Sequence, residues 1–195
     1  MIRPFLFRPL GLSALAVVAM STAAVAQAQN KPAPKPAAPA AQPAQPAAPS
    51  GPVLLGTFGD WGAYASDTPK GRVCYALSSP KERLPKELKR DPGFLFVSTR
   101  PSENVRNELS VILGYPTKDN SAGEITIGTT KFPLVTRDRS AWLANAAQDP
   151  AALEAMRKAQ SLTVRASSAR GNATTDRYSL QGLSQALDRL KKDCP

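Results

Sequence analysis

The chain has 195 residues, with 25 Lys and Arg against 15 Asp and Glu, two cysteines and no histidine. The absence of histidine excludes Ser-His-Asp triads, Cys-His pairs and most zinc sites. The sequence also lacks a G-x-S-x-G elbow, a Walker loop and a dinucleotide-binding fingerprint. We therefore expect a protein that is not an enzyme and that uses no cofactor or metal.

Residues 1–28 have the three parts of a secretory signal peptide. Arg3 and Arg8 give a basic start, an apolar stretch follows, and small residues form two A-x-A cleavage patterns that end at Ala26 and Ala28. A retained membrane anchor is the alternative, but a spanning helix needs about 20 strongly apolar residues. The sequence predicts export, cleavage after Ala26 or Ala28, and no membrane span after cleavage.

Residues 29–52 consist almost entirely of Pro, Ala and Gln, and Lys31 and Lys35 are the only charges. Such a segment has no large apolar side chains to offset the entropy lost on ordering, so we expect a disordered linker. Its prolines favour an extended, semi-rigid spacer. A passive tail is the alternative interpretation.

Residues 53–195 are long enough for one domain. Four of the 25 basic residues precede it, so 21 remain against 15 acids, a net charge of +6. This surplus favours anionic surfaces such as lipid head groups or cell-wall polymers. Nucleic acid is not an expected partner of an exported protein. The densest basic cluster, Lys81–Arg90, is interrupted by Glu82 and Glu87, which predicts a solvated loop of mixed charge.

Cys74 and Cys194 are the two cysteines, and an even count in an exported chain indicates a disulfide. Two free buried thiols are the alternative. A bond across 120 positions would restrict the unfolded chain by up to roughly 4–5 kcal/mol in the chain-entropy model. It would also attach the end of the chain to an early strand.

The sequence predicts β-strands along most of the domain. Glycines within Val53–Ala65 predict one bulged or bent strand, and Arg72–Leu77 predicts a second. Ser78–Pro92 is expected to be a loop, and Phe94–Thr99 a strand buried on both faces at its start. Further strands are predicted at Glu108–Leu113, Glu124–Ile127, Thr130–Thr136, Ser140–Leu143, Leu162–Ser167 and Asp176–Leu180.

Two helices are predicted in the second half. Asp149 is expected to cap a helix over Ala151–Gln160, with proline at its first position. Ser184–Lys192 has an apolar stripe at helical spacing and basic residues near its C-terminal end. The predicted fold class is mainly β, a single β-sandwich-like domain or curled sheet of about eight to ten short strands. One helix lies between late strands and an amphipathic helix ends the chain.

A few residues are candidates for function. Asp60 and Glu108 are acids within predicted strands, so a hydrolase without histidine is one hypothesis, although a capping or edge role is more common for such acids. Arg100 lies in a turn with Arg106 nearby, and the two are candidates for anion binding. Solvated arginines are the alternative.

Four large side chains are expected to anchor the core: Trp61, Trp142, Tyr178 and Leu187. For Trp61 and Trp142 the alternative is an exposed recognition surface. Since the domain has few aromatic residues, the core position is the preferred interpretation.

Several short segments, taken in order, are similar to one known family. They are Phe58-Gly59-Asp60-Trp61, Cys74-Tyr75-Ala76-Leu77, Arg100-Pro101-Ser102-Glu103-Asn104-Val105 with Asn107-Glu108, Gly114-Tyr115-Pro116, Ala141-Trp142, Ser168-Ala169-Arg170-Gly171, and the run from Asp176 to Leu187. Together they resemble the invasion-associated locus B family of α-proteobacterial exported proteins. The resemblance covers residues 53–194.

This resemblance implies a periplasmic, outer-membrane-associated or secreted β protein and supplies no catalytic residues. Many members carry a cysteine just after the first tryptophan, where this chain has Gly62-Ala63-Tyr64-Ala65. Cys74 is then left with Cys194 as its candidate partner. The leading hypothesis is a non-catalytic binding or interaction module of the cell envelope, with an unidentified envelope partner. A secreted factor that contacts host cells is the second hypothesis.

Overall fold

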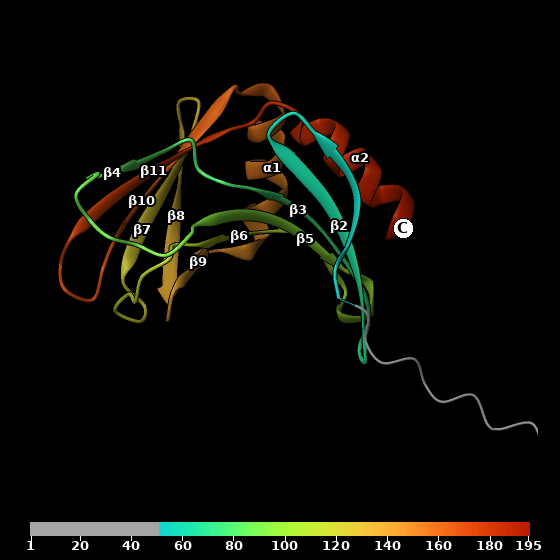
Figure 1. Ribbon diagram of the computed structural model, residues 1–195, viewed down its shortest axis with the longest axis horizontal. Coiled ribbons are helices and arrows are strands. Elements are labelled where there is room, and N and C mark those ends of the chain that lie inside the picture. The colour runs from blue at the N-terminus through green and yellow to red at the C-terminus, as the bar shows by residue number, and fades with distance from the viewer. Residues whose placement is uncertain (1–50) are drawn as a thin grey trace, which may run out of the picture. The chain divides into compact units, whose positions relative to one another are not determined.

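The structure, a computed structural model, describes residues 51–195. The predicted signal peptide and the linker up to Ser50 lie outside this range. Within it, eleven strands form one antiparallel sheet and two helices accompany it (Figure 1). The predicted fold class is confirmed: the domain is mainly β, one helix lies between late strands and an amphipathic helix is C-terminal. Of the two arrangements left open, the structure has the single curled sheet.

The strands are short, as the spacing of turn residues indicates. They are β1 (Val53–Phe58), β2 (Trp61–Thr68), β3 (Gly71–Ser78), β4 (Glu82–Leu84), β5 (Phe94–Arg100), β6 (Val105–Ile112), β7 (Ala122–Ile127), β8 (Thr130–Arg137), β9 (Ser140–Leu143), β10 (Ser161–Ser167) and β11 (Ala173–Ser179). The helices are α1 (Asp149–Lys158) and α2 (Leu183–Asp193).

One long connection departs from a simple up-and-down order. The strands run β1-β2-β3-β5-β6-β9-β8-β7-β10-β11-β4 across the sheet. β4 therefore lies at the far edge beside β11, although β3 and β5, its neighbours in the chain, lie together near the other edge. The chain crosses between the two ends of the curled sheet twice, once before and once after β4. We call the segment from Ser79 to Gly93, which includes β4, the crossing segment.

Hydrogen bonds hold the two ends of the sheet together. The Trp61 indole nitrogen donates to the Ser179 carbonyl at 3.0 Å, and the Asp60 amide donates to the Gln181 carbonyl at the same distance. The Lys81 amide donates to the Arg177 carbonyl at 2.7 Å. The start of β2 and the crossing segment are thus both fixed to the β11 side.

The core lies on the face of the sheet that α1 and α2 cover. Side chains alternate along each strand, as the two-residue period of a strand requires. In β5, for example, Leu95 and Val97 are buried while Phe94 and Phe96 are only partly buried. The expectation that this strand is buried on both faces at its start is therefore wrong, because no second layer covers the other face among the described residues.

Two further boundaries differ from the sequence-based predictions. Val53–Ala65 is a hairpin of β1 and β2, not one bent strand, because Gly59 at positive φ allows the chain to turn back. The expected bulge is present in β1, between Leu54 and Gly56. The predicted loop Ser78–Pro92 contains β4, which pairs with β11.

Both predicted helices are present, but the cap of the first differs from the prediction. α1 starts at Asp149, and the Asp149 carboxylate accepts the Leu109 amide at 3.1 Å instead of capping its own helix. The predicted cap is therefore wrong, since the carboxylate accepts a β6 amide and no amide of α1. In α2, Leu183, Leu187 and Leu190 are buried on one face, as the spacing predicts. Within residues 51–195, neither helix has the length and apolar character of a membrane span.

Candidate functional site

A buried ion cluster connects the crossing segment with β11. Asp176 lies on β11 with a side chain that is 2% exposed, and it binds two arginines of the crossing segment. Arg83 Nε lies 3.2 Å from one carboxylate oxygen, and an Arg90 guanidinium nitrogen lies 2.8 Å from the other. The predicted solvated loop over Lys81–Arg90 is thus wrong for these two side chains, because Asp176 draws both of them into the interior.

The rest of the Arg83 guanidinium group holds the backbone of the crossing segment in place. Its terminal nitrogens donate to the carbonyl oxygens of Asp91 and Leu113, each at 2.7 Å. The Asp91 backbone packs directly against Gly114, which has φ +76°. A Cβ atom at position 114 would lie 2.1 Å from the Asp91 carbonyl oxygen. Only glycine fits this contact, and the crossing segment is therefore seated firmly against the end of β6.

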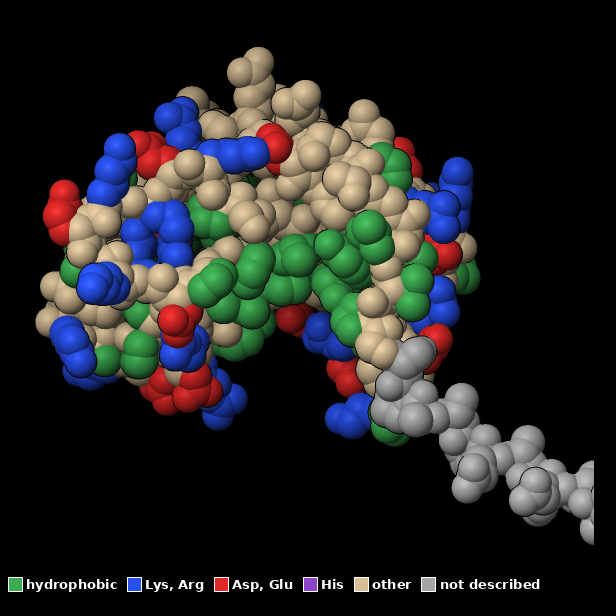
Figure 2. Space-filling model, in the orientation of Figure 1, with side chains coloured by type: hydrophobic (Ala, Val, Ile, Leu, Met, Phe, Trp, Pro, Cys, Tyr) green, Lys and Arg blue, Asp and Glu red, His purple; other side chains and the backbone are tan. Residues whose placement is uncertain are grey.

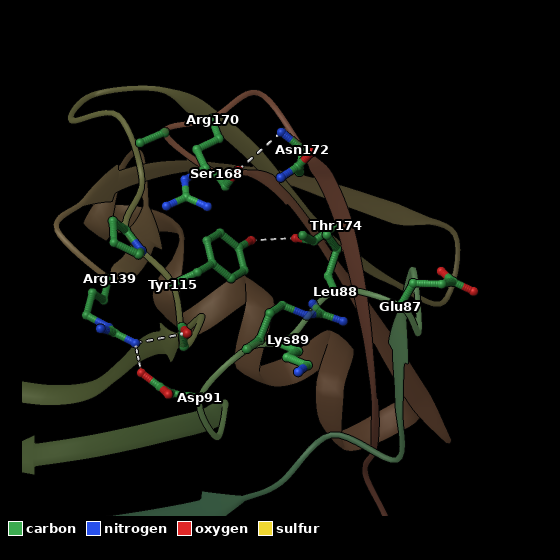
Figure 3. Close-up of a pocket in the computed structure, with 14 residues that line it drawn as sticks. Glu87, Leu88, Lys89, Asp91, Tyr115, Arg139, Ser168, Arg170, Asn172 and Thr174 are labelled. Carbon is green, nitrogen blue, oxygen red and sulfur yellow. Dashed lines mark hydrogen bonds and ion pairs between the residues drawn. The ribbon is translucent and has the colours of Figure 1, made fainter.

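A cavity of about 480 Å³ lies beside this cluster (Figure 3). The crossing segment forms one wall with residues 87–91, and the turn Gly114–Pro116 forms another. Arg139, from the β8–β9 turn, and the β10–β11 turn around Arg170 complete it. Four segments that are distant in sequence thus meet at this cavity. The crossing segment reaches it because it passes from β4, at one edge of the sheet, back to β5.

Two buried hydroxyl groups form the floor of the cavity. The side chains of Tyr115 and Thr174 are hydrogen-bonded to each other (Figure 3), and Thr174 Oγ1 also donates to the Ala166 carbonyl at 3.2 Å. Burial raises the pKa of Tyr115. The phenol therefore stays protonated at neutral pH and offers a polar, uncharged surface inside the cavity.

The cavity wall carries more positive than negative charge. Its cations are Lys89, Arg90, Arg139 and Arg170, and its carboxylates are Glu87 and Asp91. Arg139 is paired with Asp91 and also donates to the Gly114 carbonyl at 2.9 Å, while Arg90 is held by Asp176. Glu87 points away from the other lining side chains (Figure 3).

Two of these cations remain uncommitted. Lys89 and Arg170 are exposed, and neither forms an ion pair with any residue in the range 51–195. They come from opposite walls of the cavity, the crossing segment and the β10–β11 turn. Their charges are available to a ligand anion without breaking an internal pair.

The two acids considered as catalytic candidates, Asp60 and Glu108, lie outside the cavity, and each forms an ion pair with a basic side chain. Asp60 is paired with Lys81, and the Lys81 hydrogen bond is the main cause that lowers the pKa of Asp60. Glu108 accepts from Arg100 at 2.6 Å. Neither acid lines the cavity beside Tyr115. In the described part of the chain, no three acids or cysteines are grouped so that they could hold a metal ion.

The two arginines expected to bind an anion are engaged separately. Arg100 binds Glu103 at 2.8 Å as well as Glu108, so two carboxylates surround its single charge. These contacts raise the pKa of Arg100, the Glu108 hydrogen bond most of all. Arg106 is directed to the Cys194 carbonyl, at 3.5 Å. Arg100 and Arg106 are therefore held by different partners, and anion binding by the two stays a prediction.

The two cysteines and three of the four predicted core anchors are buried. The sulfur atoms of Cys74 and Cys194 lie at disulfide distance, 2.03 Å, which attaches the end of α2 to β3. Trp61 and Tyr178 are fully buried and Leu187 is nearly so. Trp142 differs: it is half-buried and its register partner Ser110 is also only partly covered.

Reasoning from sequence missed the cavity, although a signal was present. Two of the segments that carry the family resemblance line it together: Gly114-Tyr115-Pro116, and the first three residues of Ser168-Ala169-Arg170-Gly171. The β-bridge between Thr117 and Ser168 brings them side by side. Polar, turn-forming segments of this kind carry no periodic pattern, so the family resemblance marked each segment but did not show that the two meet.

The comparison with protein families gives one match. The model of the family "Invasion associated locus B (IalB) protein" matches residues 61–191, from the first residue of β2 into α2. Neither the curated proteins nor the solved structures contain a significant match to the chain. Since the family model covers most of the sequence, this chain belongs to the invasion associated locus B family.

Proposed function

We propose that this chain is a non-catalytic binding module of the bacterial cell envelope, which takes an anionic group of its ligand into the cavity beside Tyr115. One observation carries the proposal. Lys89 and Arg170, both without an ion-pair partner among residues 51–195, face a cavity whose floor holds two buried hydroxyl groups. Such a site suits a carboxylate or a phosphate, which accepts charged hydrogen bonds from the two cations above a polar, uncharged floor.

Residues outside the cavity support the envelope location. Residues 1–28 have the composition of a signal peptide. The sulfur atoms of Cys74 and Cys194 lie at bonding distance, an arrangement that persists in oxidising compartments such as the periplasm. An anionic envelope component is also the natural partner of a domain with a net charge of +6.

A binding role fits the chemistry of the site better than a catalytic one. The cavity has no histidine, and its carboxylates Asp91 and Glu87 are respectively paired with Arg139 and turned away. Tyr115 stays protonated because burial raises its pKa, so it does not serve as a base at neutral pH. The lining therefore supplies hydrogen-bond donors and positive charge, but no general base.

The experiment uses inorganic phosphate and acetate as probes of the two anion types. Amide NMR of the processed chain should show shifts centred on Gly114, Lys89 and Arg170. The double variant Lys89→Gln/Arg170→Gln should lose most of the response. The control, Arg157→Gln/Lys158→Gln, removes the same charge from α1, whose residues do not line this cavity, and should keep it.

Two results would count against the proposal. Shifts spread evenly over all exposed cations, or lost equally in both double variants, would mean that only the net charge attracts the anion. For the location, cell fractionation should recover the processed chain from the periplasm or envelope. An unprocessed chain in the cytosol with both thiols reduced would overturn that part.

A further inference from the structure

The two edges of the sheet differ in how well they are protected against pairing. An edge strand exposes unpaired backbone N–H and C=O groups, and proteins usually protect it by short length, charge or proline. β4 has all three protections: it spans three residues, carries Glu82 and Arg83, and is followed by Pro85. β1, at the opposite edge, spans six residues, Val-Leu-Leu-Gly-Thr-Phe, without charge; its protections are the bulge between Leu54 and Gly56 and Pro52, the residue before it.

β1 also exposes large apolar side chains. Val53 and Leu54 are 56% and 53% exposed, and Leu84 is the other large hydrophobic residue that is exposed within residues 51–195. α2 does not shield Val53 and Leu54, because it packs on the face of β1 to β3 where Cys74 meets Cys194. No strand in the described range pairs with the outer edge of β1. Both the edge and its side chains are therefore open.

An apolar band continues from Leu54 across the face opposite α2. Leu54 is the register partner of Tyr64, and Tyr64 that of Tyr75. The Tyr64 and Tyr75 rings stack with centroids 5.3 Å apart, and Phe96 follows at 5.7 Å from Tyr75. Phe94 extends the row, 6.2 Å from Phe96. Figure 2 shows a continuous band of hydrophobic side chains over β2, β3 and β5.

We propose that β1 is a dimerisation edge, at which two copies of this chain pair through antiparallel β1 strands. Antiparallel pairing of a strand with its own copy is self-complementary and produces a closed two-fold dimer. The absence of charge in Val53–Phe58 matters here, because two domains of net charge +6 meet at a place without like-charge repulsion. Pairing would also join the two apolar bands into one.

Charge is the reason for choosing a second copy over another partner. A strand from a charged partner would gain from opposite charges on the receiving edge, and β1 offers none. β1 offers backbone hydrogen bonds and the side chains of Val53 and Leu54, which its own copy matches. Since one strand pair makes few contacts, the dimer should be weak and dissociate on dilution.

The test is sedimentation velocity of the whole processed chain over a wide range of concentrations. We expect a reversible monomer–dimer equilibrium. Leu54→Lys introduces a charge on each copy and should shift the midpoint to at least tenfold higher concentration, about 1.4 kcal/mol. Leu84→Lys adds the same charge at the β4 edge and should leave the equilibrium unchanged. Near-UV circular dichroism checks that both variants are folded.

Hydrogen exchange at high and low concentration supplies a second measurement. Amides of β1 should become protected at high concentration in the wild type and in Leu84→Lys, but not in Leu54→Lys. A chain that is monomeric at every concentration would overturn the proposal. So would a dimer that Leu54→Lys does not weaken, or one in which β1 amides exchange at the same rate at all concentrations.

Discussion

Arg90 and Asp176 are 86 positions apart in the chain, and their side chains meet at 2.8 Å in the interior, 5% and 2% exposed. Arg83 binds the second carboxylate oxygen of Asp176. One carboxylate therefore compensates two guanidinium groups, both of which come from the crossing segment. This cluster fixes the wall of the cavity, because Arg90 is one of the wall residues 87–91 and Arg83 precedes them in the same segment.

Asp176→Asn should destabilise the domain by about 3–5 kcal/mol, because it leaves Arg83 and Arg90 in the interior without a compensating charge. Urea unfolding followed by circular dichroism measures the change. Asp67→Asn provides the control: its partner Arg72 is exposed, and the loss of that pair should cost no more than about 1 kcal/mol. Equal effects of the two substitutions would mean that the Asp176 cluster is not structurally important.

Removal of the sulfur pair should also destabilise the domain. The pair closes a loop across 120 positions and attaches the end of α2 to β3. Cys74→Ala/Cys194→Ala should lower the free energy of unfolding by about 2–5 kcal/mol. Urea unfolding with and without dithiothreitol gives the internal control, since the reductant should destabilise the wild type and leave the double variant unchanged. A wild type that is indifferent to reductant would contradict this expectation.

The sequence was informative where a pattern repeats along the chain. The apolar stripe of Leu183, Leu187 and Leu190 predicted α2, and alternating side chains predicted most strands. The pairing order was not predictable, because β4 has only three residues and lies next to β11 through contacts distant in sequence. Arg90 illustrates the consequence: in the sequence it is one basic residue in a mixed-charge run, and only the topology places it beside Asp176.

Two buried tyrosines should respond differently when their hydroxyl groups are removed. The Tyr178 hydroxyl is buried and has no hydrogen-bond partner within residues 51–195, and burial raises its pKa strongly. Tyr178→Phe should therefore raise the free energy of unfolding by about 1 kcal/mol, since an unsatisfied polar group is removed from the core. Tyr115→Phe loses the hydrogen bond to Thr174 and should lower it by about 1 kcal/mol.

Thermal and urea unfolding of the two variants, compared in the same buffer, measure these opposite shifts. Each substitution deletes one oxygen atom from a buried aromatic ring, so the two serve as controls for each other. Destabilisation by Tyr178→Phe of the same size as by Tyr115→Phe would indicate that the Tyr178 hydroxyl is satisfied in solution, for instance by a buried water molecule.

The contribution of Asp149 to the stability of the fold should decrease as pH rises, which is the reverse of the usual behaviour of a carboxyl group. Burial raises the pKa of Asp149, although the hydrogen bond from the Leu109 amide acts against this. The folded chain therefore binds this proton more tightly than the unfolded chain. The contribution to stability is fully present below the unfolded pKa of about 3.9 and is lost as pH rises through the higher folded value.

Asp149→Asn keeps an oxygen for the Leu109 amide and removes the titration. The stability of Asp149→Asn relative to wild type should therefore increase as pH rises from about 3 through the raised pKa, and then level off. Asp60→Asn should show the opposite slope. The Lys81 hydrogen bond lowers the pKa of Asp60, so the wild-type advantage is present above the unfolded pKa and is lost as pH falls. Urea unfolding of the three proteins across this range measures both slopes, and equal slopes would contradict the assignment of Asp149 as a buried acid with a raised pKa.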